Sequence, residues 1–303
     1  MSLPGDGSAG DDSALITAEV SLSSWVPTTP HARAKRRIAT LTEEIEALKQ
    51  DKAIKQRGEP SVQVLTKESE EMLKKLKQGA DSARGDDTGT LKDLVVSWVN
   101  IQCCPTPLIR ADDKHHRGFV NDPCGKLLCP AEWCWEDPTV RAGICGRTTS
   151  FIVSENSWPA FMYENYEANA ENLEHGLMKS KLLVMGFKAI FTSPSSANEV
   201  DGNGNGADVI ENCRRARRRS DQAKVKMCVA SIIGMRKVTP HAIAYIACQI
   251  RFALSNITSW HTVDGDFDYQ IFWNNIVDFF EDPPGAAAQS RINKLLEWWT
   301  RKV

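Results

Sequence analysis

Apolar positions recur at helical spacing through most of the chain. The first such stretch, over residues 34–57, places an apolar residue at every third or fourth position between charged ones. This pattern predicts an amphipathic helix with heptad character, although its seam is shorter than the roughly three to four heptads of a sustained coiled coil. The seam consists of Ile38, Leu41, Ile45 and Leu48.

The pattern of apolar and polar positions divides the chain into four parts. The tail at 1–32 is rich in Gly, Ser, Asp and Thr and has few apolar anchors, so we expect it to be disordered. A helical arm follows at 33–78, and its last helix is expected to end before Gly79. A polar linker at 79–89 then leads into one folded domain at 90–303.

Helical patterns also dominate the expected domain. Thr239-Pro240 is the clearest helix start, because a hydroxyl N-cap precedes a proline in the first turn. The helix that it opens is apolar around nearly its whole circumference, which is typical of a buried central helix. Further helices are expected at 91–99, 174–191, 209–233, 269–281 and 289–299, with another helix start at Pro159.

Strand signals are few. The turn-forming residues at 121–125 stand between two short apolar arms, which predicts a small β-hairpin over 118–129. The fold class is therefore all-α, a single helical domain with one minor β-hairpin. Large apolar residues from the separate helices are expected to form one core: Trp158, Phe161, Leu183, Phe187, Ile246, Ile250, Leu254, Phe272, Ile276, Leu295 and Trp299.

Composition restricts where the protein acts. The formal net charge is −2, so no global field attracts nucleic acid or a membrane surface, and any such contact needs a local patch. No apolar run reaches the ~18 residues that span a bilayer, and the first 30 residues lack a secretory signal. The nine cysteines are an odd number, which favours reduced thiols. We expect a nuclear or cytoplasmic protein that is neither secreted nor membrane-bound.

Cysteine and histidine residues cluster between positions 103 and 145. Thiolates and imidazoles are the ligands that tetrahedral zinc prefers, so this segment is a candidate zinc site. The segment has no pair of cysteines separated by two residues, and the alternative is that these are small apolar residues of a reduced protein. The candidate ligands are Cys124, Cys129, Cys134 and Cys145, near Cys103, Cys104, His115 and His116.

A second metal-like pattern lies at residues 201–206. Asp201, Asn203 and Asn205 place oxygen donors at the first, third and fifth positions of a calcium loop, and Gly206 supplies its turn. The twelfth position of such a loop needs a bidentate glutamate, and Asn212 stands there. A flexible connector is therefore the preferred interpretation.

One strong block of positive charge occurs at 214–219. Such a block is typical of a nuclear import signal or of a surface that contacts nucleic-acid phosphates. The alternative is a solvated helix face, as charge runs usually are. The residues that would contact an import receptor or nucleic acid are Arg214, Arg215, Arg217, Arg218 and Arg219.

Catalytic and cofactor motifs do not stand out. The chain has no nucleophile elbow, zinc-protease, phosphate-loop or dinucleotide-binding pattern in the sequence context that each requires. We therefore expect no catalytic residue and no cofactor.

Several short motifs, taken together and in order, resemble a known family. The chain is similar to a large group of proteins from mushroom-forming fungi, the basidiomycetes, that share one domain of unknown function. The resemblance covers roughly Asp87 to Val303 and implies no activity, substrate or cofactor. The motifs are Gly118-Phe119, Leu127–Pro130, Trp158–Phe161, Phe191–Ser196, Gly234-Met235, Val238–Pro240, Ile243–Tyr245, Arg251–Ser255 and Trp298-Trp299.

Three functions remain open from the sequence. The leading hypothesis is a non-enzymatic binding or scaffold protein that forms a weak homodimer through residues 34–57. The first alternative is a nuclear protein associated with nucleic acid, linked to mobile elements, that uses two basic segments. These are the block at 214–219 and a weaker cluster formed by Arg33, Lys35, Arg36 and Arg37. The second alternative is an enzyme of unfamiliar type.

Overall fold

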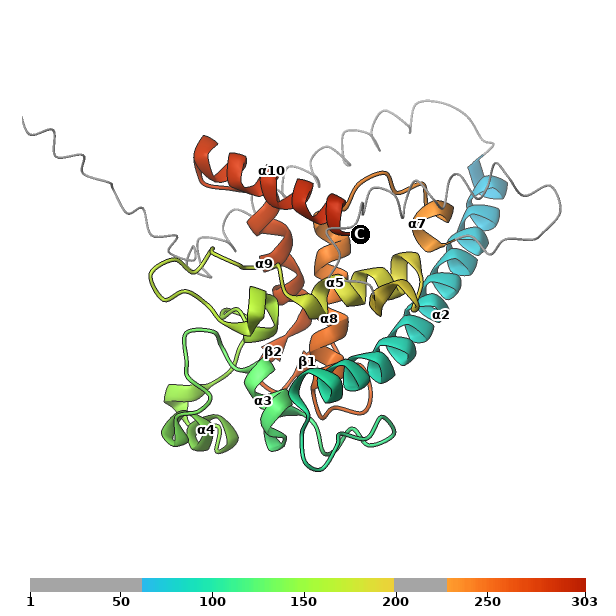
Figure 1. Cartoon of the computed structure of the whole chain (residues 1–303). Coiled ribbons are helices and arrows are strands. Elements are labelled where there is room, and N and C mark those ends of the chain that lie inside the picture. The colour runs from blue at the N-terminus through green and yellow to red at the C-terminus, as the bar shows by residue number, and fades with distance from the viewer. Residues whose placement is uncertain (1–61, 199–227) are drawn as a thin grey trace, which may run out of the picture. The chain divides into compact units, whose positions relative to one another are not determined.

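A computed structural model describes residues 62–198 and 228–303, with side-chain surroundings from residue 70 onward (Figure 1). Several predictions lie outside the described residues. These are the disordered tail and the arm helix before residue 62, the calcium-like loop at 201–206 and the arginine block at 214–219.

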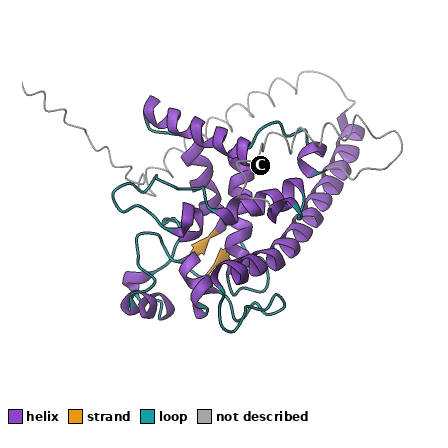
Figure 2. Ribbon diagram, in the orientation of Figure 1, coloured by secondary structure: helices purple, strands orange, loops and turns teal. Residues whose placement is uncertain are grey.

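Helices and one pair of short strands make up the described parts of the chain (Figure 2), which confirms the predicted fold class. The α-helices are α2 (Val62–Cys103), α3 (Asp122–Leu128), α4 (Pro138–Cys145), α5 (Lys181–Phe187), α7 (Val229–Ile232), α8 (Pro240–Leu254), α9 (Tyr269–Glu281) and α10 (Gly285–Lys302). A π-helical turn, Lys188–Thr192, extends α5, and 3-10 turns lie at Gly118–Val120, Thr149–Phe151, Ala160–Met162, Glu164–Tyr166 and Ser196–Asn198.

The two strands form a minimal antiparallel hairpin. β1 (Val263–Asp264) pairs with β2 (Phe267–Asp268), with Val263 opposite Asp268. Gly265 turns the chain with φ +63°, a conformation that glycine adopts without strain. The hairpin therefore holds the residues on either side of Gly265 close together.

α8 is the central helix, as predicted. The Thr239 hydroxyl caps it by accepting a hydrogen bond from the Ala242 amide at 3.3 Å. α3, α5 and α9 all contact α8, which lies in the middle of the structure in Figure 1. Most residues of α8 are buried, so apolar side chains around its whole circumference lose their contact with water.

The predicted core is confirmed. Ten of its members are buried in one apolar cluster, and Trp158 is partly buried against it. The ring of Trp299, from α10, lies 5.7 Å from the ring of Phe187, and its indole nitrogen donates to the Met178 carbonyl at 3.0 Å. The C-terminal helix is thereby fixed to the centre of the domain.

The predicted linker at 79–89 is wrong as secondary structure, because α2 continues through it. The three glycines of this segment suggested a break, but contacts of the helix with α8 compensate for their low helix propensity. The Tyr245 hydroxyl donates to the Asp87 carboxylate at 2.8 Å, and the Thr88 hydroxyl lies 2.9 Å from the Gln249 side-chain oxygen. Leu91, one turn later, is fully buried.

Alanine at Gly85 and Gly89 should stabilise the protein. A Cβ atom at either position meets no other atom within 4 Å, so the substitutions add helix propensity without a clash. We expect the double variant to raise the free energy of unfolding by roughly 0.5–1 kcal/mol per site, measured by urea denaturation followed by circular dichroism. The control is Gly118→Ala, which should destabilise, because Gly118 has φ +69° and its Cβ would lie 3.2 Å from the Asn256 amide. A destabilised double variant would show that these glycines are needed for a turn.

The predicted hairpin over 118–129 is also wrong, because the same turn residues start a helix instead. The Asn121 side chain accepts a hydrogen bond from the Cys124 amide at 3.1 Å, and Pro123 stands in the first turn of α3. Asparagine and proline favour turns and helix starts alike. Gly125 serves packing, since a Cβ atom there would lie 2.3 Å from the Trp135 ring.

Several predicted helices have different bounds. The helix expected at 91–99 lies in the last part of α2, and the one expected at 289–299 lies within α10, which begins at Gly285. Of the helix expected at 209–233, the described part is α7. The helix expected at 174–191 begins only at Lys181, where the Ser180 hydroxyl accepts from the Leu183 amide at 3.1 Å. The preceding residues form turns in which Gly176 and Met178 have φ values of +74° and +58°. The helix start expected at Pro159 gives only a 3-10 turn.

Candidate functional site

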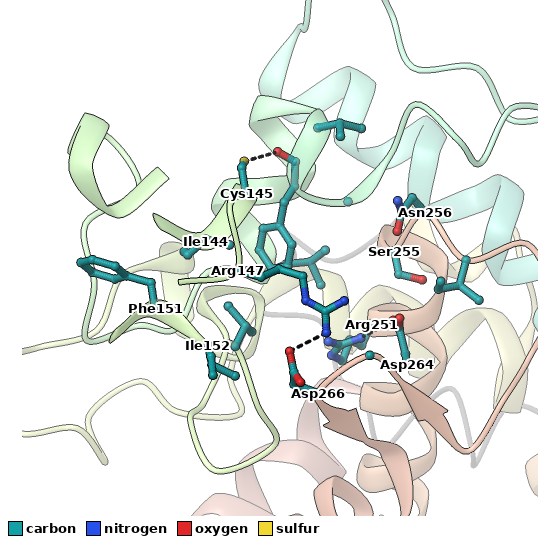
Figure 3. A pocket seen from close by; sticks show the side chains of 17 residues that line it. Ile144, Cys145, Arg147, Phe151, Ile152, Arg251, Ser255, Asn256, Asp264 and Asp266 are labelled. Carbon is teal, nitrogen blue, oxygen red and sulfur yellow. Dashed lines mark hydrogen bonds and ion pairs between the residues drawn. The ribbon is translucent and has the colours of Figure 1, made fainter. Parts of the chain in front are cut away.

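A cavity of about 400 Å³ lies between the C-terminal end of α8, the β1–β2 hairpin and the segment from α4 to Val153. This volume is within the range of ligand-binding pockets. Apolar side chains make up much of its lining and include Phe119, Ile144, Phe151, Ile152 and Ile257. We call it the arginine cavity, because Arg147 and Arg251 line its polar side together with Asp264 and Asp266 (Figure 3).

Arg251 is a buried cation in the last turn of α8. Its Nη1 atom lies 3.3 Å from the Asp264 carboxylate and donates to the Tyr269 hydroxyl at 3.1 Å. Its guanidinium carbon lies 3.3 Å from the centroid of the Phe267 ring, a stacked cation–π arrangement. These three contacts fix the guanidinium group in one orientation at the cavity wall.

Arg147 is the exposed counterpart of Arg251. Its Nη2 atom lies 2.6 Å from the Asp266 carboxylate, and 64% of its side chain is exposed. The ion pair raises the pKa of Arg147 further above its ordinary value, so the group is charged at all physiological pH values. The hairpin turn brings both acidic residues to this place, because Asp264 and Asp266 flank Gly265.

Both guanidinium groups at the cavity keep hydrogen-bond donors that no contact among the described residues uses. A guanidinium group carries five N–H donors and no acceptor. Within the described residues, Arg147 uses one nitrogen for Asp266, and Arg251 uses one nitrogen for both Asp264 and Tyr269. The remaining donors are therefore suited to an anionic group that enters the cavity.

Two further buried cations support the end of α8. Arg117 donates from Nη1 to the Ala253 carbonyl at 2.8 Å and from Nη2 to the Ala111 carbonyl at 2.7 Å. Lys114 donates to the Phe252 carbonyl at 2.5 Å and lies 3.5 Å from the centroid of the Phe252 ring. Cations at this end oppose the partial negative charge of the helix C-terminus.

Burial changes the acid–base behaviour of these cations. Burial, together with the neighbouring charges of Arg117 and Lys92, lowers the pKa of Lys114 to about 7. Burial also lowers the pKa of Arg117. The charged form of Lys114 is therefore costly in the folded protein, although its carbonyl partner stabilises it.

The four candidate zinc ligands lie in different surroundings. Cys124 and Cys129 are buried, whereas Cys134 and Cys145 are exposed. Burial raises the pKa of Cys124 to about 11 and that of Cys129 to about 12, so these two thiols resist the ionisation that metal binding requires. Among the described residues, no group of three or more His, Cys, Asp or Glu side chains is placed to hold a metal ion.

Sequence reasoning missed the residues of the arginine cavity. Arg251 appeared only within a family motif, although a charged residue on an otherwise apolar buried helix signals a specific partner. The Asp264-Gly265-Asp266 turn signal was also present in the sequence. The partners of Arg117 and Lys114 are backbone carbonyls, which no side-chain pattern identifies.

Comparison with known proteins gives one match. The family described as "Family of unknown function (DUF6698)" matches residues 78–303, which is more than half of the chain. No curated protein and no solved structure matches. The match confirms that a domain of unknown function is present, while the restriction to mushroom-forming fungi stays a prediction. Of the helices that the structure describes, none has the length and apolar character needed to cross a membrane.

Proposed function

We propose a function from the geometry of the arginine cavity in this chain, which belongs to the family of unknown function DUF6698. The domain is a non-enzymatic binding module that takes up an amphipathic ligand with an apolar body and one carboxylate group. The observation that carries this proposal is the pairing of Arg147 and Arg251 with apolar lining residues in one cavity of about 400 Å³.

The charges favour an anionic ligand group. Asp264 and Asp266 are each already paired with an arginine, so they offer little to an incoming cation. The two guanidinium groups retain free donors, and guanidinium groups bind carboxylates through two parallel hydrogen bonds. Arg147 is the more accessible of the two and would make the first contact.

The apolar residues of the lining favour an apolar body. Figure 3 shows Ile144, Phe151 and Ile152 on the left, beside Arg147 and Asp266, with Ser255 and Asn256 on the right. An alkyl chain or aromatic ring placed against these apolar residues loses its contact with water, which stabilises the complex by about 25 cal/mol per Å² of apolar surface buried.

Two nucleophile-bearing residues line the cavity, and among the residues that the structure describes neither is hydrogen-bonded to a side-chain base. The Ser255 hydroxyl donates to the Phe252 carbonyl at 2.9 Å, and the Cys145 thiol donates to the Phe119 carbonyl at 3.4 Å. Covalent catalysis requires an adjacent general base or a lowered pKa. This arrangement supports binding as the role of the cavity.

Three probes with the same eight-carbon chain test the proposal: octanoate, octanol and octyltrimethylammonium. We expect octanoate to bind most tightly in isothermal titration calorimetry, octanol more weakly, and octyltrimethylammonium weakest. Arg147→Ala should weaken octanoate binding roughly tenfold, because it removes a charge-assisted contact. Arg147→Lys, which keeps the charge and loses the planar fork, should lie between the two.

Arg291→Ala is the matched control. Arg291 forms a similar exposed ion pair with Glu174 but does not line the cavity. Its substitution should leave octanoate binding unchanged. Equal affinities for the three probes, or equal effects of the two alanine variants, would contradict a carboxylate site at Arg147.

Two other interactions rest on the sequence alone. A weak homodimer through residues 34–57 and contact of an import receptor or nucleic acid with 214–219 both concern segments outside the described residues. They stay hypotheses about additional roles and do not contribute to the proposed binding function.

A further inference from the structure

A second cavity, of about 540 Å³, lies between α2, α8, α9 and the segment that joins α8 to the hairpin. Four aromatic residues line it: Tyr245, Trp260, Tyr269 and Trp273. We call it the tryptophan cavity. None of the residues that line the arginine cavity lines it, so each site can be probed by substitutions of its own residues.

The aromatic rings present both packed and open faces. Trp260 and Tyr269 have ring centroids 4.6 Å apart, and Trp260 also packs edge-on against Phe252 at 5.3 Å. Trp260 is nevertheless 43% exposed. A large aromatic side chain held in place yet open to solvent is available to a ligand, because its π-face carries partial negative charge.

One acidic residue of α2 lines this cavity, and two more follow it along the helix. The lining residue, Asp81, is paired with Arg84, so the charges of these two residues offset each other. Asp87 does not line the cavity, but it accepts a hydrogen bond at 2.8 Å from Tyr245, which does, and it has no ion-pair partner among the described residues. Asp86 stands next to it, so the four charged residues of this stretch sum to a net negative charge.

Burial raises the pKa of Asp87, and the neighbouring Asp86 raises it further, while the bond from Tyr245 lowers it. A carboxylate that is partly removed from water without a cationic partner gains from a cation that approaches it. Two features therefore attract organic cations: the aromatic faces that line the cavity, and a carboxylate next to it that is bonded to the lining residue Tyr245 and has no ion-pair partner among the described residues.

We propose that the tryptophan cavity binds an organic cation of the quaternary or methylated ammonium class. Such a cation has an apolar methyl shell that packs on Trp260 and Trp273, and its charge is attracted by their π-faces and by Asp87. A small hydrated metal ion would lose more hydration energy than the aromatic walls return. The same chemistry occurs in free choline and in a methylated lysine side chain, and the experiment separates these sources.

The test compares choline with 3,3-dimethyl-1-butanol, which has the same shape without the charge. We expect choline to bind the full chain at least about tenfold more tightly, as followed by calorimetry and by tryptophan fluorescence. A glycine-flanked peptide with one trimethyllysine, compared with the same peptide carrying unmodified lysine, tests the second source. Tighter binding of the trimethylated peptide than of choline would assign the site to a protein partner, and the reverse order to a small molecule.

Four variants locate the binding site. Trp260→Leu should weaken choline binding roughly fivefold or more, and Trp260→Phe less, because phenylalanine keeps a weaker π-face. Asp87→Asn keeps the shape and removes the charge, so it should weaken choline without affecting the neutral probe. Trp298→Leu, a partly buried tryptophan that does not line the cavity, should change nothing.

Circular dichroism melts of each variant show whether it still folds. If Trp260→Leu does not fold, the binding data of Trp260→Phe and Asp87→Asn test the proposal. Equal binding of choline and its neutral counterpart would overturn the proposal, as would no measurable binding of choline. Unchanged choline binding in both Trp260 variants would place the site elsewhere and overturn it as well. Arg147→Ala should not affect choline, so failure here is distinguishable from failure of the proposed carboxylate site.

Discussion

Replacing Arg117 with alanine is expected to lower the free energy of unfolding by about 3–5 kcal/mol. The side chain is fully buried, and its two terminal nitrogens donate to carbonyl groups from three parts of the chain. Among these are Lys92 of α2 and Ala253 of α8. The Ala253 carbonyl lies at the end of α8 and would lose a charged donor in the interior, and each buried unsatisfied acceptor costs roughly 1–3 kcal/mol.

Chemical denaturation of the folded variant measures this loss. Arg117→Met separates the two contributions, because methionine restores most of the volume without the donors, and it should fall between the parent and Arg117→Ala. Arg110→Ala is the control, since Arg110 forms only an exposed pair with Asp112, and its loss should leave stability unchanged. A stable Arg117→Ala protein would show that water replaces the guanidinium group without cost.

The second large effect is a rise in stability between pH 7 and pH 8.5 that depends on Lys114. The pKa of Lys114 is about 7 in the folded protein and has its ordinary value of 10.5 in the unfolded chain. Between these values the unfolded chain binds more protons, so the free energy of unfolding increases with pH by at most about 1.4 kcal/mol per unit. Below pH 7 both states are protonated and the full cost of the buried charge is present.

Other groups oppose this rise at higher pH. Burial raises the pKa of Cys124, Cys129 and Cys248, so the unfolded chain loses those protons first above about pH 8.5 and stability then falls. Arg117 and Lys92 keep the pKa of Lys114 low, and Asp264 acts against them. The contribution of Lys114 to the pH dependence of stability is therefore best measured between pH 7 and pH 8.5.

Lys114→Met should remove most of this pH dependence. Urea denaturation at pH 6, 7 and 8.5 measures it, and the parent should gain about 1–2 kcal/mol across the upper interval. The variant should be more stable than the parent at pH 6, because a buried charge is replaced by an apolar side chain. The same slope in parent and variant would mean that Lys114 keeps its ordinary pKa.

Local signals were sufficient to predict the central helix and the core. The Thr239-Pro240 start defines α8 to the residue, and Tyr269–Glu281 has the predicted bounds because Asp268 caps it with hydrogen bonds to two amides. Prediction failed where one local signal supports two structures. Asn121 and Pro123 can form a hairpin turn or a helix start, and only the packing of Gly125 on Trp135 decides between them.

The candidate sites could not be predicted, because their geometry is tertiary. Arg251 meets Asp264 across the end of α8, and Arg147 meets Asp266 across 119 positions of sequence. Nothing in the spacing of these residues distinguishes them from ordinary surface charges. The continuity of α2 had the same cause, since contacts with α8 outweigh the glycines that favour a break.

One hydrogen bond joins the two cavities. Arg251 lines the arginine cavity, Tyr269 lines the tryptophan cavity, and the bond between them is 3.1 Å long. A carboxylate that draws the guanidinium group toward itself competes with the tyrosine hydroxyl for the same donors. Such a coupling is reciprocal. If the carboxylate changes the affinity for the ammonium ion by some factor, the ammonium ion changes the affinity for the carboxylate by the same factor. Two chemically unlike ligands, an acid and an ammonium ion, would then sense each other through a single shared proton donor.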